Sequence, residues 1–241
     1  MPPVIIALDF ENREKLERFL IPFGNEKLFL KIGMELYYRT GNDLVTDLKS
    51  RGHRVFLDLK LHDIPNTVEC ALSNLVKLDP DYITIHASGG AEMMRRAAGA
   101  VTGTNTRLLA ITILTSISEA MLRDDLRVEG NVRDMACHYA CRAKDSGVHG
   151  VICSPHEAAA IREKAGADFL IVTPGIRLLE DDVNDQKRVM TPENAMALGA
   201  NQLVIGRSIT TKADPVSVYR SIVTSLSKGQ EGSPWTSSRV C

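Results

Sequence analysis

Short apolar runs recur along the whole chain, and each has about the length of a β-strand. They are rich in Val, Ile, Leu or Thr and are bounded by turn residues. The runs lie at Val4–Phe10, Leu28–Met34, Arg54–Leu61, Asp81–Ala87, Arg107–Thr115, Gly150–Pro155, Phe169–Ile176 and Gln202–Ser208. The pattern predicts eight strands distributed evenly along the sequence.

Segments with helical spacing of apolar residues lie between these runs. Pro65–Leu78 is amphipathic, and Pro65 suits the first turn of a helix. Glycines stand near the predicted helix ends, where a left-handed cap favours this residue: Gly24, Gly52, Gly147, Gly166 and Gly199. Alternating strands and helices indicate a parallel sheet, because parallel neighbours need crossover helices.

Eight strand–helix units in 241 residues predict an α/β fold, a closed (β/α)8 TIM barrel in a single domain over residues 1–227. An open, doubly wound sheet is the alternative. No GxGxxG motif follows an early strand, which weakens the dinucleotide-binding form of that alternative. Residues 228–241 are polar and aperiodic, so we expect a disordered C-terminal tail.

Charged residues lie near the carboxyl ends of the first three predicted strands. Asp9 ends the first, Lys31 lies in the second, and Asp58 and Lys60 lie in the third. Alternation puts the apolar residues of each strand, such as Leu57, on the opposite face. If the apolar faces pack against helices, the charged side chains point into the mouth of the barrel, where the active sites of this fold lie.

Asp58 and Lys60 are followed by Asp63, which completes an Asp-x-Lys-x-x-Asp motif. Nearby carboxylates favour the ammonium form of Lys60. A protonated lysine is a poor Schiff-base nucleophile but a good proton donor, for example to a carbanion. The structural alternative is an ion-pair network without chemistry, but buried pairs contribute little to stability.

The last two predicted strands lead into loops suited to a phosphate group. The seventh ends in TPGIR (173–177) and the eighth in GRS (206–208). Loops after strands seven and eight commonly form the phosphate site of this fold. Gly206 would let backbone N–H groups approach the oxygens, and Arg177 and Arg207 could bind them in a fork. Both arginines could instead be ordinary surface residues.

The segment between Arg177 and Arg188 is long, polar and acidic. An inert surface loop is one interpretation. We favour a lid that closes over the phosphate and excludes water, with Gln186 binding a phosphate oxygen.

Composition and charge exclude several other classes of protein. The chain is 44% hydrophobic, and 29 basic residues balance 30 acidic ones. This balance gives no electrostatic case for binding nucleic acid or a membrane surface. No apolar run approaches the roughly 18 residues of a spanning helix, and the N-terminus lacks the features of a signal peptide. We therefore expect a cytoplasmic protein without nucleic-acid or membrane partners.

Cysteines and histidines add little evidence for a metal site. No CxxC pair occurs among the five cysteines. Cys137 and Cys141 lie four residues apart beside His138, and we favour small helix residues against the core over metal ligands. Four histidines, His53, His138, His149 and His156, are expected to be solvated. His62 and His86 fall near the mouth, but no second inward-pointing histidine can be assigned for a two-histidine, two-aspartate site, so we expect no metal.

Taken together, seven segments of this sequence resemble the bacterial monofunctional branch of the orotidine 5′-phosphate decarboxylase family. The strongest segments are DLKLHDIPNT (58–67), PGIR (174–177) and GRS (206–208). IALDF (6–10), KIGME (31–35), LTS (114–116) and NDQ (184–186) match in the same order. The resemblance covers residues 4–220. It implies a (β/α)8 barrel that converts orotidine 5′-phosphate to UMP and CO2 in pyrimidine biosynthesis without a cofactor.

The resemblance also implies a role for each matching residue. Lys60 would protonate C6 of the pyrimidine within a charged array completed by Lys31, Asp58 and Asp63. Asp63 and the Ile64–Thr67 turn would come from the neighbouring subunit of a homodimer, with the active site at the interface. Asp9 and Lys31 would hold the ribose hydroxyls, and Asp58 would lie near the reacting carbon. Ile64 and Thr67 would contact the substrate from the partner subunit, and Thr115 would lie near the base. The expected phosphate contacts are Arg177, Gln186, Gly206 and Arg207. A serine that bonds the base is either Ser116 or Ser118.

Two other functions use the same residues differently. A metal-dependent sugar-phosphate decarboxylase or epimerase could use the same Asp-x-Lys-x-x-Asp strand, and chelator sensitivity would distinguish it. A non-catalytic binder of phosphorylated ligands would bind UMP without turning anything over.

Overall fold

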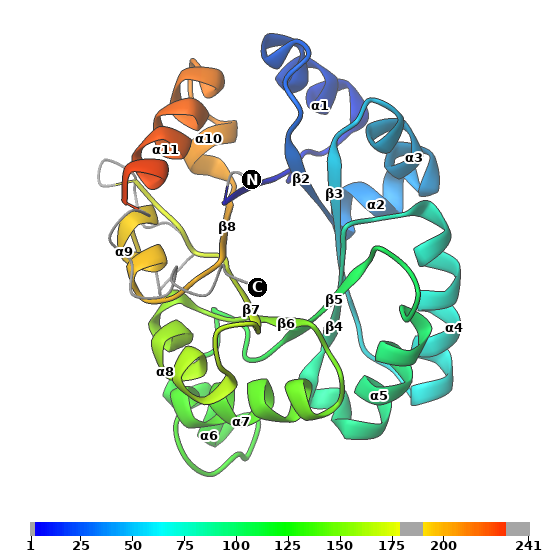
Figure 1. The fold of residues 1–241 in the computed structure, drawn as a ribbon, viewed down its shortest axis with the longest axis vertical. Helices are drawn as coiled ribbons and strands as arrows, with labels where there is room; N and C mark the ends of the chain where they lie inside the picture. Colours follow the sequence, from blue (N-terminus) through cyan, green and yellow to red (C-terminus); the bar gives the residue numbers. More distant parts are fainter. Residues whose placement is uncertain (1–2, 179–189, 230–241) are drawn as a thin grey trace, which may run out of the picture.

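Eight parallel strands close into a barrel in the computed structural model, which describes residues 3–178 and 190–229. The strands are β1 (Val4–Ala7), β2 (Phe29–Gly33), β3 (Arg54–Leu61), β4 (Tyr82–His86), β5 (Arg107–Ile111), β6 (Gly150–Ile152), β7 (Leu170–Thr173) and β8 (Gln202–Ile205). Each strand pairs with its neighbours in sequence, and β8 closes the ring against β1. The predicted (β/α)8 barrel is therefore confirmed (Figure 1).

Helices surround the barrel and connect its strands (Figure 1). They are α1 (Arg13–Leu20), α2 (Met34–Thr40), α3 (Asn42–Ser50), α4 (Pro65–Leu75), α5 (Gly90–Ala100), α6 (Glu119–Asp124), α7 (Val132–Asp145), α8 (Pro155–Ala165), α9 (Pro192–Ala197), α10 (Arg207–Thr210) and α11 (Pro215–Gly229), with short 3-10 helices η1 (Ile21–Phe23), η2 (Val76–Leu78) and η3 (Ala87–Gly89). Eight helical segments were expected, whereas the connections after β2, β5 and β8 each hold two α-helices. After β2 the break falls at Gly41, whose φ of 63° interrupts the helical backbone.

The alternation predicted for the first three strands is confirmed by two separate hydrophobic clusters. Ile5, Phe29 and Phe56 belong to a small cluster inside the barrel. Ile6 and Leu57 belong to the large cluster between the strands and the helices. The residues that alternate with the outer apolar face therefore point into the barrel.

Aromatic rings and an arginine close the amino-terminal end of the barrel. The Arg54 guanidinium lies 3.9 Å from the centre of the Phe29 ring, and Arg54 Nε donates to Asp81 Oδ1 at 2.7 Å. The Phe29 and Tyr82 rings are 5.0 Å apart in an edge-on arrangement. These side chains pack at the amino-terminal ends of their strands, at the end of the barrel away from the carboxyl-terminal mouth.

One close approach explains a glycine in the wall of the barrel. A Cβ atom at Gly150 would lie 2.4 Å from both the Cβ atom and the carbonyl oxygen of Leu170. Real Cβ atoms do not come so close to other heavy atoms, so β6 can pair with β7 here only with glycine at this position.

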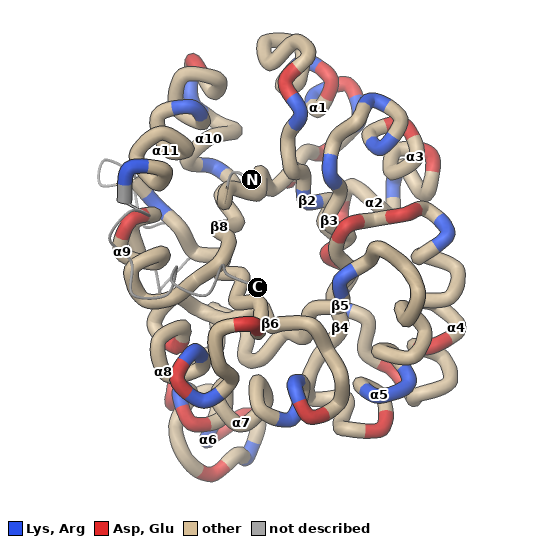
Figure 2. Tube along the Cα trace, in the orientation of Figure 1, with Lys and Arg blue, Asp and Glu red and all other residues tan. Residues whose placement is uncertain are grey.

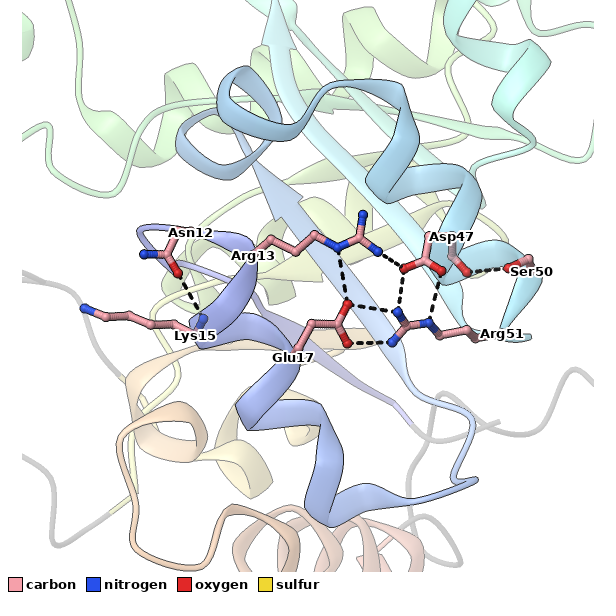
Figure 3. A network of polar contacts seen from close by, with 7 residues as sticks. All are labelled: Asn12, Arg13, Lys15, Glu17, Asp47, Ser50 and Arg51. Atoms are coloured by element: carbon pink, nitrogen blue, oxygen red, sulfur yellow. Dashed lines mark hydrogen bonds and ion pairs between the residues drawn. The ribbon is translucent and has the colours of Figure 1, made fainter.

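Charged residues mostly lie on the helices and loops around the barrel (Figure 2). A network on one side ties α1 to α3 (Figure 3). Arg51 Nη1 lies 2.7 Å from Glu17 Oε2, and Arg51 Nη2 lies 2.6 Å from Asp47 Oδ2. Arg13 also pairs with both Glu17 and Asp47. These ion pairs connect α1 with the carboxyl-terminal end of α3 on the surface, away from the barrel mouth.

Two histidines hold strand starts together, and the expectation that both are solvated is wrong. His53 is buried, and its Nδ1 accepts the N–H of Leu28 at 3.2 Å. His149 is half-buried, and its Nδ1 accepts the N–H of Leu108 at 3.1 Å. Burial lowers the pKa of both imidazoles. Because each Nδ1 accepts a hydrogen bond from a backbone N–H of the neighbouring strand, that nitrogen carries no proton. His138 and His156 are exposed, as expected.

The remaining expectations concern single features of the described residues. Cys137 lies on α7 and is buried, and Cys70, Cys137, Cys141 and Cys153 are free thiols. Within residues 3–178 and 190–229, no helix is long and apolar enough to cross a membrane. Helix α11 runs to Gly229, so it includes the first two positions of the expected tail; residues 230–241 lie outside the described part of the chain.

Candidate active site

A cavity of about 430 Å³ opens at the carboxyl-terminal mouth of the barrel. Its wall combines a cluster of charged side chains with an apolar face and the ends of two glycine-containing loops. The lining residues are Ala7, Asp9, Lys31, Phe56, Asp58, Lys60, Ile111, Ile113, Leu114, Thr115, Ile152, Cys153, Pro174, Gly175, Arg177, Val204, Gly206 and Arg207. Seven residues predicted for the site from the sequence and the resemblance therefore lie around one cavity with Gly206: Asp9, Lys31, Asp58, Lys60, Thr115, Arg177 and Arg207.

The charged residues at the ends of the first three strands form a continuous array. Lys60 Nζ lies 2.8 Å from Asp58 Oδ2. Lys31 Nζ lies 3.3 Å from the same oxygen and 3.4 Å from Asp9 Oδ1. Positive and negative groups alternate, from Asp9 through Lys31 and Asp58 to Lys60. The predicted convergence of these four side chains is seen in the structure.

The array keeps its buried members charged. Burial would raise the pKa of Asp58, but the positive charges of Lys31 and Lys60 and the hydrogen bonds from Lys60 and Thr84 outweigh it, so the pKa lies below its ordinary value. Burial would likewise lower the pKa of Lys31, but the charges of Asp58 and Asp9 outweigh it and the pKa is raised. At neutral pH the site therefore holds a carboxylate between two cations.

The third strand departs from regular geometry where it carries the array. Leu57 pairs with Ile83 and Leu61 with Ile85, so β3 uses four residues where β4 uses two. Within this bulge Lys60 has a φ of 54°. A left-handed backbone at a residue other than glycine costs roughly 1–3 kcal/mol, so the contacts around Lys60 must hold it in this conformation.

Thr84 on β4 holds the bulge and was not predicted as a site residue. Its side chain is fully buried beneath the array. The backbone N–H of Lys60 donates to Thr84 Oγ1 at 2.9 Å, and Thr84 Oγ1 donates to Asp58 Oδ1 at 3.0 Å. A signal was available in the sequence, because Thr84 lies two residues after Tyr82, shares its face of the strand and is a polar residue on the inner face of an apolar strand.

The turn after β3 lies apart from the cavity of its own chain. Asp63, Ile64 and Thr67 are exposed, and none of them lines the cavity. Ile64 keeps 67% of its surface exposed. The structure therefore does not bring these three residues to the array within one subunit.

The loops after β7 and β8 form the part of the cavity wall that adjoins β1, because β8 pairs with β1 and a Cβ atom at Gly206 would lie 3.5 Å from Asp9 Oδ2. Arg177 is buried, and its Nη1 donates to the carbonyl of Ile176 at 2.9 Å. Gly206 directly follows β8, and exposed Arg207 begins α10. Gln186 and the expected lid lie outside the described residues, because residues 179–189 are not among them.

The loop after β5 brings Thr115 to the cavity, but neither candidate serine lines it. Ser118 Oγ accepts the N–H of Met121 and caps α6. Ser116 is exposed. The question of which serine contacts a base therefore stays open, although the hydroxyl of Ser118 already has a structural partner.

The His62 and His86 rings stack 5.3 Å apart beside the mouth. Burial and the nearby His62 and Lys60 lower the pKa of His86. Across the described residues, no group of three or more His, Cys, Asp or Glu side chains is placed to hold a metal ion.

The carboxyl-terminal mouth is where (β/α)8 barrels carry out catalysis. Fold and site thus define the class of this protein, which is a barrel enzyme with a lysine–aspartate array. The chain belongs to the orotidine 5′-phosphate decarboxylase / HUMPS family, whose family model matches residues 2–222.

Individual relatives agree with this assignment. Orotidine 5′-phosphate decarboxylase from Bacillus caldolyticus is 49% identical over 223 residues, covering 90% of this chain and 91% of the relative. The enzyme of that name from Geobacillus kaustophilus is 50% identical over 223 residues, with the same coverage.

Solved structures show the same similarity in three dimensions. A crystal structure of orotidine 5′-phosphate decarboxylase from Lactobacillus acidophilus has a TM-score of 0.83 and 40% identity, covering 93% of this chain and 98% of that one. An uncharacterized conserved protein from Geobacillus kaustophilus has a TM-score of 0.82 and 44% identity, covering 91% and 98%.

Proposed function

We propose that this cavity decarboxylates orotidine 5′-phosphate to UMP and CO2, with the Lys60 ammonium as the proton donor at C6. The reaction belongs to pyrimidine biosynthesis and follows from membership of the family. The observation that carries the role of Lys60 is its position: the ammonium lies in the cavity, 2.8 Å from Asp58 and within the alternating array.

The proposed step uses no cofactor. The bond between C6 and the carboxyl carbon breaks, CO2 leaves, and the electron pair stays on C6. This carbanion is poorly delocalised by the ring, so its barrier is high. An ammonium held in place beside C6 stabilises the charge as it develops and then transfers a proton to carbon. Such preorganised electrostatic stabilisation is typically worth several kcal/mol.

Asp9, Lys31 and Asp58 prepare Lys60 for this step. Asp58 contacts both ammonium groups, so it fixes the position of Lys60 and keeps the array close to neutral. Asp9 is exposed at the rim, where its carboxylate and Lys31 can bind ribose hydroxyls. Thr115 lies on the wall beside the apolar residues that would face the base.

The substrate phosphate is proposed to bind at the loops after β7 and β8. Gly206 lets backbone N–H groups approach the phosphate oxygens, and Arg177 and Arg207 line the same region. Gln186 would contribute from the segment outside the described residues. Phosphate binding far from C6 can then be used to order the array.

The active site is proposed to be shared between two subunits of a homodimer. Asp63, Ile64 and Thr67 are exposed and do not line the cavity of their own chain, which supports their entering the site of a partner. Two further exposed apolar side chains, Met34 at 40% and Tyr38 at 75%, lie on one face of α2. A cytoplasmic location is proposed because the four described cysteines are free thiols.

The first experiment follows the ultraviolet absorbance of orotidine 5′-phosphate mixed with the purified protein in excess EDTA. A steady loss of absorbance with UMP as the product is expected. No change would contradict the proposed reaction, and metal addition with sugar-phosphate substrates would then test the metal-dependent alternative. Lys60→Ala should abolish turnover, whereas Lys77→Ala, on the surface in η2, should not change it.

Sharing of the site is tested by mixing two inactive variants, Lys60→Ala and Asp63→Ala. In mixed dimers one of the two sites contains both substitutions and the other contains neither. Random exchange of subunits should therefore restore about a quarter of the wild-type activity. A mixture no more active than its parents would contradict a shared site.

A further inference from the structure

A single buried hydroxyl connects the backbone of Lys60 to the carboxylate that pairs with its ammonium. Thr84 Oγ1 accepts the N–H of Lys60 and donates its proton to Asp58 Oδ1. An amide N–H can only donate and a carboxylate can only accept, so both roles of the hydroxyl are fixed.

These contacts close a ring around the proposed proton donor. From Thr84 Oγ1 the ring runs to the backbone N of Lys60, along the Lys60 side chain to Nζ, across 2.8 Å to Asp58 Oδ2, and back through Asp58 Oδ1. Thr84 Oγ1 therefore holds both ends of Lys60, the backbone N–H directly and the ammonium group through Asp58. The Thr84 hydrogen bonds lie at the bulge of β3, where Lys60 has a positive φ.

Thr84 acts from below the site rather than within it. It is 0% exposed and does not line the cavity, so it cannot touch a substrate. Its register partner on β5 is Leu109, which belongs to the hydrophobic cluster inside the barrel. The hydroxyl is thus held in a rigid, water-excluded layer, where a hydrogen bond is electrostatically stronger than in water.

We propose that Thr84 is a positioning residue for decarboxylation, which orients Lys60 and Asp58 through its hydroxyl. The inference rests on the proposed role of Lys60. Without the hydroxyl, the Lys60 N–H and Asp58 Oδ1 each lose a partner, and the bulge can relax. A displacement of about 1 Å at a reacting group can cost about a hundredfold in rate.

The test compares three substitutions at Thr84 in the full-length enzyme. Thr84→Val keeps the shape and removes the hydroxyl, Thr84→Ser keeps the hydroxyl, and Thr84→Cys keeps the size with only a weak donor and acceptor. Thr106→Val is the matched control, because Thr106 is a buried threonine whose hydroxyl donates to Pro80 O at 2.7 Å, outside the site.

The expected result is a loss of kcat with little change in KM. Thr84→Val should lower kcat about a hundredfold, Thr84→Cys should fall between Val and Ser, and Thr84→Ser should stay within a few-fold of wild type. Thr106→Val should keep kcat. The acid limb of the pH profile of kcat should also move to higher pH in Thr84→Val, because Asp58 loses a hydrogen bond to its ionised form. A purely structural threonine would not move that limb.

Two outcomes distinguish this inference from the proposed function. If Lys60→Ala is inactive but Thr84→Val or Thr84→Cys has the kcat and pH profile of wild type, the role of Thr84 is wrong and that of Lys60 stands. If Lys60→Ala retains turnover, the proposed role of Lys60 is wrong, and the positioning role falls with it. Should Thr84→Val not fold, the kcat of the Cys variant relative to the Ser variant decides the question.

Discussion

Asp58 lies between two ammonium groups, and this position makes the effect of neutralising it predictable. Lys60 Nζ is 2.8 Å and Lys31 Nζ is 3.3 Å from the same carboxylate oxygen. Asp58→Asn keeps the shape of the side chain and an oxygen that can accept the Thr84 hydroxyl proton. It removes the negative charge and replaces Oδ2, the atom that both ammonium groups contact, by an amide NH2 group that can only donate. Two cations are therefore left side by side, with exposed Asp9 near Lys31.

The free energy of unfolding should fall by about 3–5 kcal/mol, the usual cost of removing one partner from a buried ion pair. At an effective dielectric constant of about 20, each contact of roughly 3 Å is worth about 5 kcal/mol before solvation. The wild-type carboxylate also loses several kcal/mol of hydration, which offsets one of the two contacts. In a domain of this size, such a loss lowers Tm by about 6–20 °C.

Thermal unfolding of Asp58→Asn, Lys60→Met and the double variant at neutral pH measures this effect. Lys60→Met should lose less stability, because Asp58 still pairs with Lys31. The double variant should be more stable than Asp58→Asn alone, because one unpaired cation is gone. The reasoning is falsified if Asp58→Asn is as stable as wild type, or if the double variant is the least stable of the three.

The same substitution predicts a pH dependence with a definite sign. The folded pKa of Asp58 lies below its ordinary value of 3.8, so its contribution to stability is complete above that value. The contribution is lost as the pH falls through the folded pKa. The difference in Tm between wild type and Asp58→Asn should therefore shrink in strong acid.

Three further predictions address other parts of the molecule. Arg162 is buried, and its guanidinium donates to backbone carbonyls around the α8–β7 connection, so Arg162→Met should lower stability by more than about 3 kcal/mol and leave turnover at 25 °C unchanged. Burial depresses the folded pKa of His53, so its contribution to stability is complete above the ordinary value of 6.5 and the wild-type Tm should fall as the pH drops below that value; His53→Gln, with an oxygen acceptor, should reduce that fall. Arg207→Ala should lower kcat/KM for orotidine 5′-phosphate about 10–100-fold and leave the reaction of orotidine, which lacks the phosphate, unchanged.

The faces of the strands were predictable from the sequence because alternation has a period of two and one face is apolar. Phe56 lies in the inner cluster and Leu57 in the outer one, so Asp58 had to point into the barrel. The same argument applied to β4 would have selected Thr84. It was missed because threonine is common in strands and carries no charge to mark it.

Other features depend on contacts that a single sequence does not encode locally. The bulge in β3 contains no glycine, and the positive φ of Lys60 leaves no trace in the residue types around it. His53 and His149 looked like loop residues, whereas each accepts a hydrogen bond from the backbone of the strand that the barrel places beside it. That pairing becomes visible only once the register of the strands is known.

Lys31 and Asp58 are less exposed than Lys60, and this difference in exposure suits the proposed role of Lys60 as the proton donor. The side chains of Lys31 and Asp58 are 11% and 12% exposed, whereas that of Lys60 is 27% exposed. This exposure supports the proposed contact between Lys60 and an incoming substrate, although the backbone of Lys60 is anchored by Thr84. The inner aromatic layer below keeps water out, so the charges above it interact strongly. The proposed transfer of a proton from Lys60 to carbon would not require the array to reorganise, because Asp58 and Lys31 remain paired when Lys60 becomes neutral.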